Sequence, residues 1–130
     1  MSCVKSAFDD AYRHLDSNPP DTKAAVRSIF ESIEILVKQM VTTKNLNKWV
    51  VENTLKEKCL SLFTDDVSIQ VVTGLFDSMS RWVDSIHYYR HGQPALEPVA
   101  PSEEIAIHII STGSSYLRLL IQLDLRLSNV

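Results

Sequence analysis

The spacing of apolar residues along the chain predicts a series of helices. In several stretches apolar side chains recur at three- and four-residue steps, which places them on one face of an α-helix. We expect helices over residues 7–16, 22–41 and 67–92, and another that begins after Ser102 and continues towards residue 127. A further helix is expected near residues 46–62. Its second half carries a clear stripe and its first half does not, so the first half is either a helical turn or a loop.

Polar residues and prolines mark the ends of these helices. Asp21, either Thr64 or Asp65, and Ser102 stand at positions where a side-chain oxygen can cap a helix N-terminus. Gly92, with a proline two residues later, is expected to end the helix over 67–92. The intervening links are short, except for the proline-containing segment 93–101.

These elements predict an all-α fold, organised as one domain over residues 1–130. Short links favour antiparallel neighbours, and the chain has only three glycines for the turns of a strand-rich fold. We therefore expect an antiparallel up-and-down bundle of four main helices plus a short N-terminal helix. Small residues in the last helix allow a neighbouring helix to approach closely: Ser111, Gly113, Ser114 and Ser115.

Composition narrows the class of protein further. A hydrophobic fraction of 45% with 22% charged residues is typical of a globular protein, and a net charge of −3 argues against broad coating of nucleic acid. The apolar runs are too short to span a bilayer, and no secretion signal is recognised. Cys3 and Cys59 lack metal-ligand spacing and are interpreted as free thiols in a reducing compartment. We expect a cytoplasmic protein with no membrane association.

The most distinctive feature is a group of cations at the end of the helix over 67–92. The apolar stripe that includes Val83 and Ile86 reaches Arg90 one turn later, where an apolar residue would be expected. His87 and His91 lie beside it. One interpretation is that cations in a last turn complement the helix dipole and that Arg90 extends from the core edge to water. The other is a polar pocket built around Arg90 and His91.

A second polar pair borders the stripe of the helix over 22–41. Glu34 lies beside Phe30 and Val37, and Arg27 lies two turns earlier on nearly the same line. These residues either form surface ion pairs along their own helix or belong to the Arg90 pocket. We predict that Arg27, Glu34, Arg90 and His91 meet in space.

Arginine with histidine suits phosphodiester chemistry. The guanidinium fork binds phosphate through two hydrogen bonds, and histidine transfers protons near neutral pH. RNA supplies its own nucleophile, the 2′-hydroxyl, so this chemistry requires no metal and no cofactor. His87 and His91 have the spacing of two metal ligands on one helix face, but no third ligand is indicated. We predict no metal site.

Several segments together resemble a family of abortive-infection-type domains. The segment 25–34 resembles the first long helix of that family, the segment 89–92 its Arg-His segment, and the segments 109–111 and 114–117 its last helix. These domains are similar to the HEPN superfamily of helical bundles. Many HEPN proteins are metal-independent endoribonucleases of defence and toxin systems, with an arginine and a histidine contributed at a dimer interface. Arg81 and His87, with five residues between them, also match the family's usual spacing.

The resemblance implies a HEPN-like phage-defence or toxin-type domain that acts on RNA. Arg90 would bind phosphate, His91 or His87 would transfer the proton, and Arg27, Glu34 and Arg81 would bind or position. A homodimer is expected, with Trp82, Tyr88 and Tyr89 at its interface, and a larger effector or an antitoxin is a further expected partner. The alternative is a non-catalytic helical interaction or nucleotide-sensing module of a larger defence effector.

Overall fold

The computed structural model describes residues 2–90 and 99–129, and over these residues the chain is helical, without strands. The all-α prediction is therefore confirmed. The elements in order are α1 (Ser2–Asp16), α2 (Thr22–Met40), the π-helix η1 (Val50–Leu55), α3 (Lys56–Leu60), α4 (Asp66–Ser85), α5 (His87–Arg90) and α6 (Glu103–Ser128).

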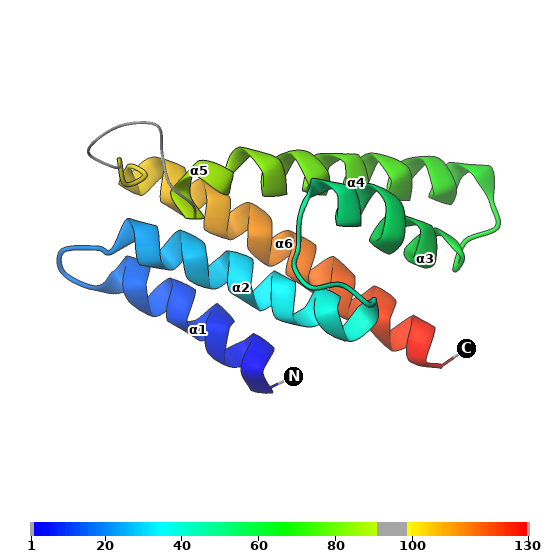
Figure 1. Ribbon diagram of the computed structural model, residues 1–130, viewed down its shortest axis with the longest axis horizontal. Coiled ribbons are helices and arrows are strands. Elements are labelled where there is room, and N and C mark those ends of the chain that lie inside the picture. Colours follow the sequence, from blue (N-terminus) through cyan, green and yellow to red (C-terminus); the bar gives the residue numbers. More distant parts are fainter. Residues whose placement is uncertain (1, 91–98, 130) are drawn as a thin grey trace.

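Four long helices alternate in direction through the molecule. Figure 1 shows α1 and α4 along opposite edges, with α2 and α6 between them. Helix α2 packs against both α1 and α6. This arrangement is compatible with an up-and-down bundle. The set of long helices differs from the expected set. Helix α1 was expected to be short and has 15 residues, whereas the third helical region is divided between η1 and α3.

The apolar stripes form one continuous core. Its largest fully buried side chains come from α1, α2, η1, α4 and α6, and they include Ile29, Ile33, Leu55, Phe76 and Leu120. Burial of a side chain of this size contributes about 1.5–3 kcal/mol relative to leaving it in water. Packing of the stripes therefore holds the helices together.

Side chains cap the helices at the expected positions. Asp21 Oδ1 accepts a hydrogen bond from the Ala24 amide at 3.1 Å, and Asp65 Oδ2 accepts one from the Ser68 amide at 2.8 Å. Ser102 Oγ accepts one from the Ile105 amide at 3.3 Å. These bonds satisfy amides that have no partner within the helix. The hydrogen bond from the Ser68 amide, together with one from the Ser68 side chain, lowers the pKa of Asp65.

Three helix boundaries or faces differ from the sequence prediction. Helix α1 begins five residues before residue 7, because Val4 extends the buried stripe by one turn. Leu75 lies four positions before Met79 and eight before Val83, on the apolar repeat of α4, and is nevertheless 39% exposed. The helix expected over 67–92 is interrupted at Ile86, where α4 ends and α5 begins. Its expected end at Gly92 lies outside the described residues.

The structure of the third helical region accounts for the irregular spacing of its apolar residues. Its buried residues are Val50, Val51, Leu55 and Cys59: the first two are adjacent, Val50 lies five positions before Leu55, and Val51, Leu55 and Cys59 are four apart. A π-helix has i→i+5 hydrogen bonds, so its side chains follow a longer repeat than those of an α-helix. A search for the α-helical repeat therefore finds no single stripe in its first half.

Close packing between α4 and α6 requires a small residue at Gly113. A Cβ added there would lie 2.8 Å from Trp82 Cζ2 and 2.9 Å from Ile29 Cγ1. We expect Gly113→Ala to lower the free energy of unfolding through an overpacking cost of about 1–3 kcal/mol. A gain in helix propensity of about 1 kcal/mol offsets part of this cost.

Gly74→Ala is the matched control, because a Cβ at that position meets nothing within 4 Å. It is expected to raise the free energy of unfolding by up to about 1 kcal/mol. Urea denaturation of both variants measures the difference. Equal stabilisation by the two substitutions would contradict the close packing at Gly113.

The two cysteines occupy opposite environments. Cys3 is exposed and Cys59 is buried, where burial raises the pKa of its thiol to about 11. We expect a thiol reagent near pH 8 to modify Cys3 rapidly in the native protein and Cys59 only after unfolding. Between about pH 8.5 and pH 11 the unfolded chain releases a proton that the folded protein retains, so the thiol's contribution to stability is lost as pH rises. Rapid modification of both thiols in the native protein would contradict this burial.

Measured over residues 2–90 and 99–129, none of the helices combines the length and the apolar content that crossing a membrane requires.

Candidate functional site

A small cleft lies at the boundary between α4 and α5. Residues 45–48, from the linker between α2 and η1, form part of its lining, and Val83, Asp84, His87 and Arg90 form the rest. Its volume is about 230 Å³. We call this the Arg90 cleft and call residues 41–49 the linker. The cleft therefore contains two of the residues selected from the sequence, His87 and Arg90.

The break after α4 determines the position of both residues. Ile86 is buried and ends α4, and its carbonyl accepts a hydrogen bond from the Tyr89 amide at 3.0 Å. An i→i+3 bond of this kind tightens the chain relative to an α-helix. His87 and Arg90 are three residues apart on the short helix that follows, so both can reach the same cleft.

Arg90 lies over an aromatic ring of the core. Its guanidinium carbon is 3.2 Å from the centroid of the Phe30 ring, in a cation–π contact. Burial lowers the pKa of Arg90, and the nearby Glu34 carboxylate partly opposes this by favouring the cation. The bundle thus holds Arg90 in a partly dehydrated position at the edge of the core.

Glu34 binds the linker. Its Oε2 accepts a hydrogen bond from the Leu46 amide at 2.8 Å. Among the described residues no ion pair within 4.0 Å joins Glu34 to Arg90, so their interaction acts at longer range. In place of the expected direct contact with Arg90, the Glu34 carboxylate binds the linker. It acts on the charge of Arg90 at longer range.

Two asparagines give the linker its shape. Asn47 Oδ1 accepts a hydrogen bond from the Val50 amide at 2.9 Å, which caps the helical region that follows. Asn47 Nδ2 donates to Asn45 Oδ1 at 2.8 Å. These bonds help to position Lys48, which also lines the Arg90 cleft. Asn45, Asn47 and Lys48 were not predicted as site residues, although an asparagine before a helix is a recognisable capping signal.

The other candidate residues lie apart from the cleft or outside the described chain. Arg27 on α2 and Arg81 on α4 are exposed, and neither lines the Arg90 cleft. The predicted meeting of Arg27 with Arg90 is therefore not supported by the cleft lining. His91 lies outside the described residues. The cleft itself combines Lys48, His87 and Arg90 with one acid, Asp84.

This set of groups can bind an anion and move a proton. Arginine and lysine bind phosphate oxygens, and histidine exchanges protons near neutral pH. Within the part of the chain that the structure describes, no three histidine, cysteine or acidic side chains gather as a metal site would require. Lys48, His87 and Arg90 are therefore chemically able to bind a phosphate and exchange a proton.

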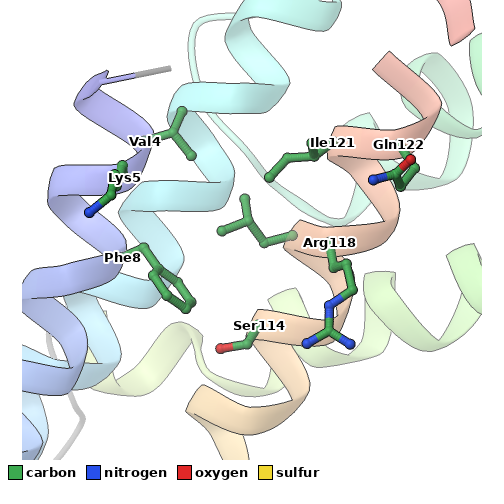
Figure 2. Close-up of a pocket in the computed structure, with 8 residues that line it drawn as sticks. Val4, Lys5, Phe8, Ser114, Arg118, Ile121 and Gln122 are labelled. Carbon is green, nitrogen blue, oxygen red and sulfur yellow. The ribbon is translucent and has the colours of Figure 1, made fainter. Parts of the chain in front are cut away.

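A wider groove runs between α1 and α6. Figure 2 shows Val4 and Phe8 from α1 across from Ser114, Arg118 and Ile121 from α6. The groove has a volume of about 520 Å³ and an apolar floor. Lys5 is paired with Asp9 at 2.7 Å, and the groove contains neither a histidine nor a carboxylate. It lacks the groups needed to transfer a proton, so the Arg90 cleft is the stronger candidate site.

Comparisons with protein-family models, curated proteins and solved structures found no match to this chain. The residues of the Arg90 cleft are therefore the basis for the function proposed below.

Proposed function

We propose that the Arg90 cleft binds a phosphate of RNA, and that the chain is a HEPN-like domain of the defence or toxin type. The observation that carries the proposal is that His87 and Arg90 line one cleft together with Lys48. Two cations and one proton-transfer group in a space of about 230 Å³ suit a phosphodiester. The resemblance of segments 25–34 and 89–92 to abortive-infection-type domains supports the same assignment.

Each cleft residue has a distinct role in this proposal. Arg90 lies on Phe30, and its planar guanidinium presents its N–H groups at the edge of the plane, where they can bind two phosphate oxygens. Lys48 adds a point charge. His87 accepts the proton of the 2′-hydroxyl as the 2′-oxygen bonds to the adjacent phosphorus and forms a 2′,3′-cyclic phosphate. The bond from phosphorus to the 5′-oxygen breaks, and the 5′-oxygen takes a proton from solvent. The reaction needs no metal, because the substrate carries the nucleophile.

An RNA-cleavage assay in the presence of a chelator tests this function. We expect wild-type protein to cleave labelled RNA, and His87→Ala to reduce the rate by about 10²-fold or more, as loss of a general base does. Arg90→Lys retains the charge and removes the two-oxygen fork, so it tests phosphate binding with less disturbance than Arg90→Ala.

His108→Ala and Arg13→Ala are the matched controls. Both residues are exposed and neither lines the Arg90 cleft. They are expected to retain wild-type cleavage. Equal cleavage by wild type and His87→Ala would exclude His87 as the proton-transfer group, and no cleavage by any protein would contradict catalysis on the RNA used.

A non-catalytic phosphate-sensing or interaction module is the second candidate. The contact of Arg90 with Phe30 favours it, because that contact occupies part of the guanidinium that would otherwise bind a reacting phosphate. A nucleotide that raises the melting temperature without being consumed would support this alternative.

A homodimer through α4 and α5 is also part of the proposal. Tyr88 is 58% exposed and Arg81 is exposed on the preceding helix, and such residues are enriched at interfaces. Trp82, which was expected at the interface, is buried in the core instead, and Tyr89 is half-buried against the core. Sedimentation of wild type and Tyr88→Asp tests the dimer. Monomeric wild type at tens of micromolar, roughly the range of weak association, would contradict it.

A further inference from the structure

A second cleft shares the linker with the Arg90 cleft. It has a volume of about 680 Å³, and its lining residues are Val41, Thr42, Trp49, Asn53, Thr54, Glu57 and Lys58. We call it the Trp49 cleft. The linker contributes Lys48 to the Arg90 cleft and the next residue, Trp49, to this one. Consecutive residues of one short stretch of chain therefore line the two clefts.

We propose that the Trp49 cleft binds a nucleobase, with guanine preferred, beside the phosphate bound by the Arg90 cleft. The inference rests on the proposed function for the position of the phosphate. It adds the class of base that the domain selects. Single-stranded nucleic acid is bound in general by aromatic platforms that stack bases, next to cations that hold the backbone.

Trp49 has the properties of a stacking platform. It is 66% exposed, whereas the other tryptophan of the chain, Trp82, is 7% exposed. Asn53 Nδ2 donates a hydrogen bond to the Trp49 carbonyl at 2.9 Å, which helps to fix the backbone that carries the indole. Trp49 immediately precedes η1, and π-helical turns occur frequently at functional sites. An exposed indole that lines a cleft can offer a face to a flat ligand.

Glu57 gives the cleft its preference among bases. It is exposed and lines the cleft, and within residues 2–90 and 99–129 no hydrogen bond or ion pair engages its carboxylate. A carboxylate only accepts hydrogen bonds. The Watson–Crick edge of guanine carries two adjacent donors, N1–H and the N2 amine, that match two carboxylate oxygens. Adenine, cytosine and uracil each place an acceptor beside their donor on that edge.

Lys58 helps to shape the cleft. Its ammonium group donates a hydrogen bond to the Met40 carbonyl at the end of α2, which ties α3 to the start of the linker. Thr42 and Thr54 add hydroxyl groups that can donate or accept. The cleft thus combines an aromatic face, an acceptor pair and uncommitted hydroxyls, as a base site requires.

Tryptophan fluorescence reports on this site directly, since Trp49 is exposed and Trp82 is buried. We expect GMP to quench the emission of the full chain saturably, and AMP and UMP to bind about 10-fold more weakly, as loss of a two-hydrogen-bond contact does. Trp49→Leu should remove the quenching while Trp82 continues to emit. Glu57→Gln should bring the affinity for GMP to that for AMP, and Glu31→Gln, an exposed residue of α2 outside the cleft, should leave it unchanged.

Absence of saturable quenching by GMP, or quenching that persists in Trp49→Leu, would overturn the base site. Equal affinity for GMP, AMP and UMP would overturn the guanine preference. Guanosine and Arg90→Lys separate this inference from the proposed function. Saturable Trp49 quenching with equal affinity for guanosine and GMP would retain the base site and reject the phosphate site. Arg90-dependent RNA binding that is unchanged in Trp49→Leu would retain the phosphate site and reject the base site.

Discussion

Replacing Trp82 with alanine is expected to lower the free energy of unfolding by about 3–5 kcal/mol, as truncation of a buried aromatic side chain does. Its indole stacks on Phe30 with ring centroids 6.4 Å apart and meets Tyr116 edge-on at 5.7 Å. Its Nε1–H donates a hydrogen bond to the Ile109 carbonyl at 3.3 Å. One side chain of α4 therefore contacts α2 and α6, and its removal leaves a cavity among three helices.

Urea denaturation of Trp82→Ala, Trp82→Phe and Trp49→Ala measures this effect. Trp82→Phe retains a ring and loses the N–H donor, so its stability should lie between those of wild type and Trp82→Ala. Trp49→Ala removes the same side chain from an exposed position and should change stability by less than about 0.5 kcal/mol. Similar losses for the two alanine variants would show that Trp82 does not bridge the helices as described.

The helices and their caps could be predicted because they depend on local sequence. The three- and four-residue spacing of apolar side chains marks the faces of α2, α4 and α6, whatever they pack against. Asp21, Asp65 and Ser102 cap the amide of a residue three positions along the chain. A short-range rule is enough to identify such contacts.

The breaks in the helices depend on tertiary packing and could not be predicted. Leu75 follows the helical repeat of α4 and is nevertheless exposed, because which side of a stripe is covered depends on where neighbouring helices lie. The end of α4 at Ile86 has no glycine or proline to signal it. The π-helix η1 likewise has no local marker beyond the irregular spacing of its buried residues.

The candidate site, like the helices, could be predicted only where local spacing determines it. His87 and Arg90 lie three residues apart, so a helical repeat predicts that they lie close together, and both line the same cleft. The residues across the cleft come from the linker, whose course no periodic pattern describes. The partner of Glu34 is a backbone amide twelve residues away. Every residue carries such an amide except proline, so the sequence gives no sign of which one is chosen.

The hydrogen bond from the Leu46 amide to Glu34 is the basis of the second prediction with a large expected effect on stability. Glu34→Ala is expected to lower the free energy of unfolding by about 1–3 kcal/mol, because a partly buried amide loses a charged hydrogen-bond acceptor. The linker would then be held less firmly, so RNA affinity at the Arg90 cleft should fall as well. Glu34→Gln keeps an acceptor oxygen and should lose less stability. Glu31→Ala removes an exposed carboxylate of the same helix and should change stability by less than about 0.5 kcal/mol.

A double-mutant cycle of Glu34→Gln with Arg90→Met tests the electrostatic part of this arrangement. The Glu34 carboxylate favours the charged form of Arg90, so the two substitutions together should cost less than the sum of the single losses. A coupling of about 0.5 kcal/mol or more is expected for interacting neighbours. High salt should reduce it little, because the guanidinium is partly buried on Phe30. Strict additivity would mean that Glu34 acts only through the Leu46 amide and does not stabilise the charge of Arg90.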